Sequence, residues 1–566
     1  MSSAPLPSAS DPSEGGCAGG VVGVGPAGVQ STVVSRTFNL ADLWEGVVDE
    51  LGDEREALVV RSETLGDRRL RHTELEERAN RLAHHLQACG VGPGDTIGCH
   101  LQNGSEYLEA MLAAFKLRAI PINLNHRYVP EELRYHFEDA HPVVVLTEPD
   151  LVDRVQAAGP PPHVLVRGDG YEAALAASSP ERPAVPDRSD DDLYLLYTGG
   201  TTGMPKGVMW RHEDLFFGVM GGNGVPRRGI PRLDDPDAIG PWARTGTGVD
   251  RRIPLAPLMH GLAQWTALTT LYNGGTLFLD GDRSFDAARA LSIVAEERIQ
   301  LIQLVGDVLA LRIADELKRN GERYDLSELQ LISSSGAVLS PSVQQDLREL
   351  LPNARVVNRF GASETGPQGR VAHDKGAEAP RLVSDENTAV LDDDFRRVGP
   401  GGSGVLAQTG HIPLGYWGDE AKTARTFPVV DGVRWSVPGD RARVEEDGSI
   451  VVLGRGTVVI NSGGEKIFPE EVEIALKAHP AVFDAIVVGV PDETYGQRVA
   501  AVVALREGAE APSLDDLQAH ARERIAGYKV PRQVTVVDAV QRTTVGKADY
   551  AWAREAAAGE GEHSDG

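Results

Sequence analysis

Apolar residues along the chain follow two repeats, one typical of amphipathic helices and one typical of buried strands. After the capping-box spacing Thr73–Glu76, apolar residues recur at helical period up to Leu86, and glycines from Gly90 onward end the predicted helix. The other elements predicted in this part are strands over 96–101, 119–124 and 142–146 and a helix over 106–117. Strands that alternate with helices predict parallel sheets covered on both faces.

The same repeats continue through the rest of the chain. Ser340 directly before Pro341 predicts the start of a helix. Alternating apolar and polar residues on both sides of Asp447-Gly448 predict a hairpin of segments 441–445 and 449–453. The further predicted strands are 193–197, 329–332 and 355–360.

Several segments show neither repeat. The first 35 residues are rich in Ser, Pro and Gly, and we expect them to be flexible. Residues 220–250 are either an idle insertion or a mobile lid, and we favour the insertion. Residues 380–404 resemble an acidic connector. After residue 456 the pattern becomes that of a small α/β unit, and we expect residues 551–566 to fray.

The charge balance and the cysteines narrow the class of protein. The chain has 56 basic and 83 acidic side chains, a formal net charge of −27, which argues against a general nucleic-acid-binding protein. Its three cysteines form neither a disulfide framework nor a metal-ligand pattern, as expected in a reducing compartment. We see neither an apolar run long enough for a membrane span nor a convincing signal peptide. We therefore expect a cytoplasmic protein.

A loop rich in glycine and threonine follows the predicted strand 193–197. Glycines let the backbone approach phosphate oxygens closely, threonine hydroxyls add donors, and Lys206 adds a positive charge. A P-loop would need Ser or Thr directly after the lysine, and Gly207 stands there instead. We therefore predict a phosphate-binding loop of another kind, made of Thr198, Gly199, Gly200, Thr201, Thr202, Gly203 and Lys206.

The string TGGTTGMPKG resembles the phosphate loop of the adenylate-forming superfamily, which includes acyl-CoA synthetases, luciferases and adenylation domains. Similar motifs follow in the family's order from about residue 40 to 550. The resemblance implies an α/β fold with a large N-terminal domain, 36–454, of stacked α/β sheets and a small β-barrel-like subdomain. It also implies a small mobile α+β C-terminal domain, 455–550, that carries a catalytic lysine, and it implies ATP, Mg²⁺ and coenzyme A as cofactors.

The resemblance also assigns nucleotide-binding roles. The segment from Gly361 to Glu364 resembles the family's aromatic-Gly-x-Thr-Glu motif, so that Ser363 would bind phosphate and Glu364 would hold Mg²⁺. Asp440 matches the aspartate that binds the ribose hydroxyls, although Pro438 replaces the usual threonine. The residues that match the adenine pocket are Ser335, Gly336, Ala337, Asn358, Arg359 and Phe360.

The other implied site residues lie beside the carboxylate and toward the C-terminus. His260, in PLMHG, resembles the residue next to the acid, although a structural role stays open. Lys547, in RTTVGK, resembles the catalytic lysine, with Gln541 where proline is common. The remaining implied residues are Arg455 for the nucleotide, Gly456 and Thr457 for the hinge, and Ser462, Gly463 and Gly464 for coenzyme A.

Together these residues imply a ligase that forms an acyl-adenylate and passes the acyl group to coenzyme A. The stretch YTGGTTGMPKGVMWRHEDLFFGVMGG looks most similar to bacterial synthetases of long-chain or steroid-side-chain acids, which implies a hydrophobic acid. Its large apolar residues could line the acid pocket, but we favour the core for them: Trp210, Phe216, Phe217 and Met220.

Three alternative functions stay open. A luciferase-like oxidative enzyme shares the adenylation motifs, a related ligase would pass the acyl group to a carrier-protein thiol, and a non-catalytic protein would bind nucleotide alone. Thr457, Pro438 and Gln541 depart from the family pattern and keep the last alternative open, whereas Lys547 and Glu364 argue against it. The expected partners are small molecules. The sequence leaves the oligomeric state open, a homodimer included.

Overall fold

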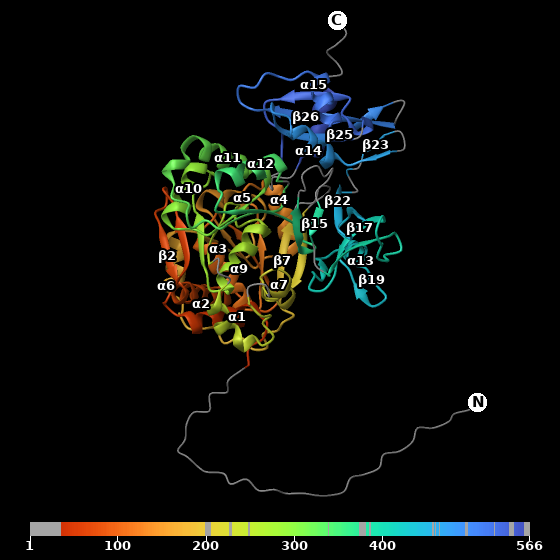
Figure 1. Cartoon of the computed structure of the whole chain (residues 1–566). Coiled ribbons are helices and arrows are strands. Elements are labelled where there is room, and N and C mark those ends of the chain that lie inside the picture. The colour runs from red at the N-terminus through yellow and green to blue at the C-terminus, as the bar shows by residue number, and fades with distance from the viewer. Residues whose placement is uncertain are drawn as a thin grey trace, which may run out of the picture. The chain divides into compact units, whose positions relative to one another are not determined.

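The computed structural model describes residues 35–198, 205–225, 229–246, 250–337, 339–372, 381–383, 386–455, 458, 460–462, 465–492, 496–525, 527–542 and 548–559. The predicted flexible N-terminal segment lies outside these residues except for Ser35. Much of the described chain follows the predicted alternation of strands and helices, and Figure 1 labels the principal elements.

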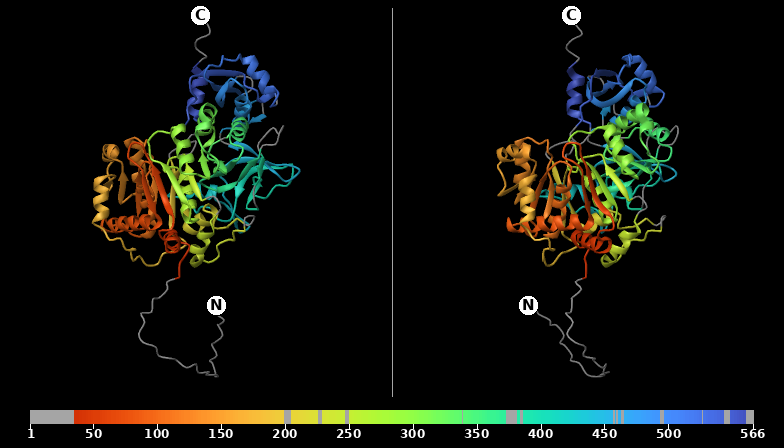
Figure 2. Two further views of the ribbon diagram at one scale, coloured as in Figure 1. Left: turned by 60° about the vertical axis from the view of Figure 1, so that its left-hand side comes forward. Right: turned by 90° about the vertical axis from the view of Figure 1, so that its left-hand side faces the viewer.

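A four-stranded parallel sheet, in the order β4-β3-β5-β6, lies near the N-terminal end of the described chain and is drawn in orange in Figure 2. The three predicted strands are confirmed, and β6 is a further one. The strands are β3 (Thr96–His100), β4 (Ile120–Asn123), β5 (Val144–Thr147) and β6 (His163–Val166). The helices of this region are α2 (His72–Ala88), α3 (Ser105–Lys116), α4 (Pro130–Ala140), α5 (Val152–Ala157) and α6 (Asp169–Ala176), with a 3-10 turn at Pro149–Leu151.

The predicted cap of α2 is displaced by two residues. The helix begins at His72, with Arg71 at the N-cap, and the Arg71 backbone N–H donates to Glu74 Oε2 at 2.8 Å. The Thr73–Glu76 capping box is therefore wrong. Glu76 is buried instead and accepts a hydrogen bond from the indole of Trp44, because it faces the core side of the helix.

A sheet of thirteen strands forms the centre of the large domain, in the order β16-β17-β21-β22-β15-β14-β13-β12-β11-β9-β10-β1-β2. Six neighbouring strands, from β13 to β1, run parallel. These strands and the edge strand are β1 (Glu56–Arg61), β2 (Arg68–Arg71), β9 (Arg251–Pro254), β10 (Thr276–Asp280), β11 (Leu301–Leu304), β12 (Leu331–Ser334) and β13 (Arg355–Ala362). β12 begins two residues later than the sequence predicted.

Helices on the two faces of these parallel strands have different roles. On one face, α10 (Ala287–Glu296), α11 (Gly306–Asn320) and α12 (Pro341–Leu350) form a separate apolar core with the sheet. On the other face, α9 (Gly261–Tyr272) packs against β9 and β10. Ser340 is the N-cap residue of α12 and Pro341 its first residue, as predicted, but the Ser340 side chain makes no capping hydrogen bond within the helix.

The other half of the large sheet is antiparallel. It includes strands inside the segment 380–404 that we predicted to be a connector, so that prediction is wrong for residues 381–383, 388–391 and 403–404. The predicted hairpin around Asp447-Gly448 is confirmed. These strands are β14 (Gly366–Ala372), β15 (Arg381–Val383), β16 (Thr388–Leu391), β17 (Ser403–Gln408), β21 (Asp440–Val444) and β22 (Ile450–Arg455). The same region of the chain also contains α13 (Glu420–Thr426) and the strand pair β19 (Val429–Val430) and β20 (Val433–Arg434).

A three-stranded antiparallel sheet carries the predicted phosphate loop. Its order is β18-β8-β7, formed by β7 (Leu193–Thr198), β8 (Lys206–Arg211) and β18 (Gly415–Tyr416), and α7 (His212–Gly218) follows β8. The segment 220–250 contributes to the core where it is described. Its 3-10 turn Pro236–Ala238 and α8 (Ile239–Thr245) contact α1 (Leu40–Leu51), and Ile239 and Trp242 are buried. An idle insertion is therefore an incomplete interpretation of this segment.

The C-terminal domain is a separate α+β unit with its own apolar cores. Its sheet contains β23 (Ile460–Ser462), β24 (Glu465–Ile467), β25 (Val482–Asp492), β26 (Gly496–Leu505) and β27 (Gln533–Val537). Its helices are α14 (Pro469–Lys477), α15 (Leu514–Arg522) and α16 (Tyr550–Ala558), with a 3-10 turn at Gly527–Lys529. The predicted frayed tail is wrong for α16, because Ala553 and Ala557 are buried against β25 and β26.

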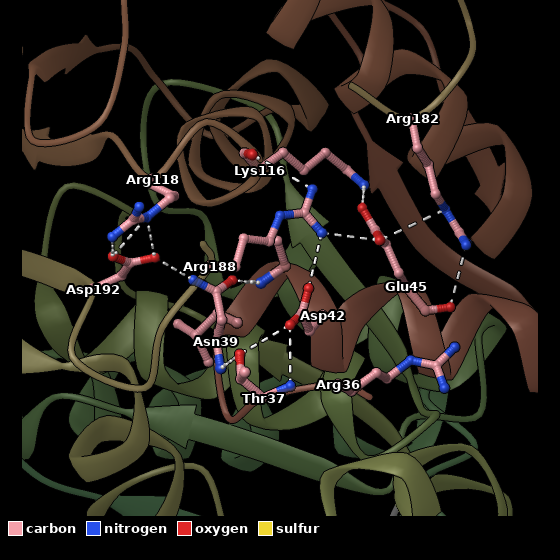
Figure 3. A network of polar contacts seen from close by, with 12 residues as sticks. Arg36, Thr37, Asn39, Asp42, Glu45, Lys116, Arg118, Arg182, Arg188 and Asp192 are labelled. Carbon is pink, nitrogen blue, oxygen red and sulfur yellow. Dashed lines mark hydrogen bonds and ion pairs between the residues drawn. The ribbon is translucent and has the colours of Figure 1, made fainter. Parts of the chain in front are cut away.

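A network of ion pairs joins the helices α1 and α3 to the segment that leads into β7 (Figure 3). Glu76 brings α2 into the same network. Lys116 Nζ lies 2.7 Å from Glu45 Oε1 and 2.8 Å from Glu76 Oε1. Arg182 and Arg188, from the segment before β7, contact the same two carboxylates. The charges are therefore paired where water is excluded, and they connect the helical core to the strand that precedes the phosphate loop.

Candidate active site

One cavity of about 970 Å³ lies at the carboxyl ends of the parallel strands, where open α/β sheets bind ligands. Its volume is at the upper end of the range usual for small-molecule sites. It brings together residues that the sequence predicted separately: Thr198, Ser335, Gly336, Ala337, Asn358, Arg359, Phe360, Gly361, Ser363, Glu364 and Asp440 all line it. These residues come from strands of two sheets, so the fold and not their order in the chain makes them neighbours.

The predicted phosphate loop is the connection between two paired strands. Thr198, the last residue of β7, stands opposite Lys206, the first residue of β8. Gly199, Gly200, Thr201, Thr202 and Gly203 lie outside the described residues. Lys206 Nζ is 3.5 Å from Asp419 Oδ2. Burial disfavours its charge, but Tyr135 and Asp419 outweigh that effect and raise the pKa of Lys206, so it stays a cation.

The turn after β13 is held by hydrogen bonds that aim Glu364 at the cavity. The Tyr416 hydroxyl donates to Glu364 Oε1 at 2.9 Å, and the Ser436 hydroxyl donates to the Glu364 carbonyl. The Trp210 indole N–H donates to the Ser363 carbonyl at 3.1 Å. The carboxylate is thus oriented by one bond and keeps further acceptor sites directed at the cavity it lines.

A single carboxylate in this place fits Mg²⁺, which usually binds one or two protein carboxylates together with nucleotide phosphates. Among the described residues there is no group of three or more His, Cys, Asp or Glu side chains that could hold a metal ion alone. A resident metal cage is therefore absent from that part of the chain. The donor set instead suits an ion that arrives with a phosphate.

Asp440 and Arg455 are cross-strand neighbours on β21 and β22. Asp440 is buried and lines the cavity, and the preceding Gly439 has a φ of +102°, a conformation that favours glycine. Two residues that the sequence placed fifteen positions apart are therefore adjacent in space. The hinge residues Gly456 and Thr457 lie outside the described part of the chain.

Residues of the C-terminal domain also line the cavity. Arg542 and Ala548 form an isolated antiparallel bridge, and both contribute to the cavity wall. Two short hydrogen bonds, 2.6 and 2.8 Å, attach the Arg542 guanidinium to Asp484. Lys547 itself lies outside the described residues, immediately before Ala548. Ser462 ends β23 and is not among the residues lining the cavity, and Gly463 and Gly464 are not described.

The cavity continues along α9 as a chamber, lined by apolar and polar residues, that the sequence did not predict. His260 is the N-cap residue of α9 and directly precedes the lining residue Gly261, although its own side chain does not line the cavity. The side chains that face the cavity recur at helical spacing: Leu262, Trp265, Thr266 and Thr269. On the opposite wall the sheet contributes Arg252, Leu301, Gln303 and Ser333.

The large apolar residues after the phosphate loop belong to the core, as favoured from the sequence. Trp210, Phe216, Phe217 and Met220 are at most 3% exposed, and none of them lines the cavity. The signal for the chamber is a stripe of residues at helical spacing along α9. In the folded protein these are the partly exposed positions of the helix, and they line the cavity.

No helix in the described ranges is long and apolar enough to cross a membrane.

Comparisons with known proteins agree with this geometry. Residues 47–417 match the family described as "AMP-binding enzyme", and residues 471–547 match its C-terminal domain. The chain is 46% identical to a 3-oxocholest-4-en-26-oate–CoA ligase of Rhodococcus rhodochrous, over 92% of this chain and 96% of that protein. It is 45% identical to a medium/long-chain-fatty-acid–CoA/3-oxocholest-4-en-26-oate–CoA ligase of Mycolicibacterium smegmatis, with the same coverage.

Solved structures share the fold over almost the whole chain. ATP-bound MatB of Rhodopseudomonas palustris superposes with a TM-score of 0.75 at 26% identity, covering 91% of this chain and 98% of that one. An anthranilate CoA ligase in complex with anthranoyl-AMP has a TM-score of 0.78 at 22% identity, covering 92% and 97%, which supports the fold alone. From the match over both domains and the identity to these relatives, the chain belongs to the AMP-binding enzyme family.

Proposed function

We propose that this protein is an AMP-forming acyl-CoA synthetase that activates a hydrophobic carboxylic acid. In the first step a carboxylate oxygen attacks the α-phosphorus of ATP, and the acyl-adenylate forms as pyrophosphate leaves. In the second step the thiol of coenzyme A attacks the acyl carbon, so that a thioester and AMP form and the thiol proton is released. The observation that carries the proposal is one cavity that joins the nucleotide motifs to the chamber along α9, where Leu262, Trp265 and Leu301 supply apolar surface.

Each end of the cavity has a role in the first step. Phe360, Asn358 and the segment Ser335–Ala337 would enclose the adenine, and Asp440 would accept hydrogen bonds from the ribose hydroxyls. The loop between Thr198 and Lys206 would bind the phosphates. When bound at Glu364, Mg²⁺ would neutralise phosphate charge. These fixed groups would stabilise the negative charge that develops at the α-phosphate in the transition state. Their contribution would be electrostatic stabilisation more than acid–base catalysis.

Lys547 would complete the adenylating site, and the C-terminal loop would serve the second step. The segment that carries Lys547 begins after Arg542 and ends before Ala548, two residues that line the cavity, and this supports a role in adenylate formation. Rotation about Gly456 and Thr457 would then remove Lys547 and bring Gly463 and Gly464 to the acyl group, where small residues admit a pantetheine arm.

The acid is expected to be hydrophobic and of medium to large size. Leu262, Trp265 and Leu301 supply much of the apolar wall of the chamber. The relatives named above act on fatty acids and on a cholestenoate with an oxo group, and we propose acids of these two classes. Cytoplasmic location and homodimer formation stay predictions.

Pyrophosphate and AMP release across a panel of fatty, aryl and sterol-derived acids, with and without coenzyme A, tests the proposal. We expect stoichiometric AMP and thioester with hydrophobic acids. Formation of ADP in place of AMP would overturn it. Thioester formation only on a carrier-protein thiol, or oxygen-dependent light emission from the adenylate, would favour one of the alternative enzymes.

The role of Lys547 has its own test. Lys547→Ala should abolish adenylate formation yet leave thioester formation from supplied acyl-AMP largely intact, because the lysine contacts only the first transition state. Lys318→Ala, which removes a lysine whose side chain is 47% exposed, is the matched control and should leave both half-reactions unchanged. Equal losses in the two half-reactions of Lys547→Ala would contradict the assignment.

A further inference from the structure

A row of polar side chains crosses the floor of the chamber along α9. Gln303 on β11 pairs in register with Ser333 on β12, and Arg359 on the next strand, β13, donates from Nε to Ser333 Oγ at 3.3 Å. All three residues line the cavity. Gln303 is 6% and Ser333 is 2% exposed, so these two side chains are built into the sheet, whereas the Arg359 side chain is exposed.

The surroundings of the row are largely apolar. On the same face of the sheet, two residues nearer the strand starts, Leu301 and Leu331 form an apolar cluster with Val357. Across the cavity stand Leu262 and Trp265 of α9. Buried polar groups are costly unless they have hydrogen-bond partners, and Gln303 and Ser333 each have one within the protein. The exposed Arg359 guanidinium has further N–H groups that water or a bound ligand would accept from.

The donors of the row exceed the acceptors that the protein provides. Gln303 Nε2 donates to the Leu304 carbonyl at 3.2 Å. A guanidinium has five N–H donors. Among the described residues, the Arg359 side chain donates only to Ser333, and none of their carboxylates lies within ion-pair distance of it.

The position of the row favours the acid over the nucleotide as its ligand. Side chains alternate along β13, so Asn358 and Phe360 face the opposite side of the sheet from Arg359. Ser333 precedes Ser335 by two residues, which puts it roughly 7 Å inside the strand end where the adenine pocket begins. An acid whose hydrocarbon part lay along α9 would face this part of the cavity wall.

From this geometry we propose that Gln303, Ser333 and Arg359 bind an oxygen substituent, an oxo or hydroxyl group, on the hydrocarbon part of the acid. The inference rests on the proposed acyl-CoA synthetase activity and refines its substrate class. The row supplies donors, and an oxo or hydroxyl oxygen supplies the acceptor. A plain hydrocarbon displaces water from the same place and leaves the donors unpaired, which is the basis of strong discrimination.

The test uses the whole enzyme and a series of acids that carry one oxo or hydroxyl group at successive positions, each compared with the unsubstituted acid. We expect kcat/KM to favour the oxygenated acid by at least about tenfold at one or two positions, the size of one hydrogen bond to a charged donor. A ratio near one at every position overturns the inference but leaves the proposed function standing. Absence of AMP and thioester with every acid overturns both.

Substitutions then assign the preference to the row. Arg359→Met and Gln303→Leu should reduce the ratio of kcat/KM for the oxygenated acid over the unsubstituted acid by about tenfold or more. Gln345→Leu changes an exposed glutamine on α12 and is the matched control, for which the ratio should be unchanged. If Arg359→Met instead raises the KM for ATP and lowers kcat/KM for both acids equally, Arg359 serves the nucleotide or the carboxylate, and the inference is overturned. The first test, the kcat/KM ratio of oxygenated to unsubstituted acid in the wild-type enzyme, does not depend on whether any variant folds.

Discussion

Lys116 is a cation with no exposed surface, and its removal measures how much the ion-pair network stabilises the large domain. In Lys116→Met an apolar chain of similar length takes its place, and the carboxylates of Glu45 and Glu76 lose their shared partner. Removing one partner of a buried ion pair costs ~3–5 kcal/mol of unfolding free energy. Because Arg182 and Arg188 still contact these carboxylates, we expect the lower end of this range, about 3 kcal/mol.

Urea unfolding gives the measurement. With a slope of about 3 kcal/mol per molar, such a loss lowers the midpoint by about 1 M. The matched control is Lys318→Met, because Lys318 Nζ lies 2.6 Å from Asp346 Oδ2 with side chains 47% and 35% exposed. An exposed ion pair contributes ~0–1 kcal/mol to the free energy of unfolding, so the urea midpoint of Lys318→Met should be almost the same as that of the wild type. Equal losses in the two variants would refute the reasoning.

The acid dependence of stability provides a second check on the same network. Burial raises the pKa of Glu45, but Lys116 and Arg188 outweigh it and lower the pKa from 4.5 to about 2. The folded pKa is below the unfolded one, so this stabilisation, about 3 kcal/mol, is present above pH 4.5 and is lost as the pH falls from 4.5 toward 2. The difference between the wild type and Lys116→Met should therefore shrink over this range. A difference that grows on acidification would contradict the assigned charges.

Three substitutions probe the site itself. Lys477→Met removes the buried Nζ that lies 3.0 Å from Asp307 Oδ2 and ties α14 to α11. We expect the rate of adenylate formation to fall at least about tenfold relative to the rate of thioester formation. Equal losses in the two rates would contradict this. Glu364→Gln keeps an acceptor for the Tyr416 hydroxyl but removes the negative charge. It should raise the Mg²⁺ concentration that gives half-maximal rate about tenfold or more. An unchanged Mg²⁺ concentration would show that Glu364 does not hold the metal. Lys206→Ala should slow adenylate formation at least about tenfold, since a charged hydrogen bond contributes ~1.5–3 kcal/mol; an unchanged rate would place Lys206 outside the phosphate site.

The sequence predicted elements where local pattern and burial agree, and it failed where tertiary contacts decide. Strand β5 and helix α3 were predicted because each has an apolar run or period of its own. The capping box of α2 was assigned to Glu76, since the spacing alone cannot show that this carboxylate bonds the Trp44 indole in the core. Likewise α16 looked like a polar tail, and only its packing on β25 shows that Ala553 belongs to a core.

The nucleotide end of the site could be predicted to a greater extent than the acid end. Ser335 and Glu364 lie in short turns at strand ends, where a few consecutive residues line the cavity and a contiguous string of sequence specifies them. The partner that orients Glu364, Tyr416, lies fifty-two residues farther along the chain and carries no local signal. The role of Lys547 stays a prediction, because that residue is outside the described part of the structure.

The acid end is encoded by single side chains on separate elements. Trp265 reaches the cavity because of its position on the face of α9, and Gln303 becomes part of a polar row because its strand pairs in one register with Ser333. A shift of one residue in that register would turn Gln303 to the opposite face of the sheet. A substitution at Gln303 leaves every family motif intact, yet it changes the cavity wall that we propose the acid contacts. The motif strings therefore identify the reaction, whereas the choice of acid depends on side chains whose surroundings only the folded sheet defines.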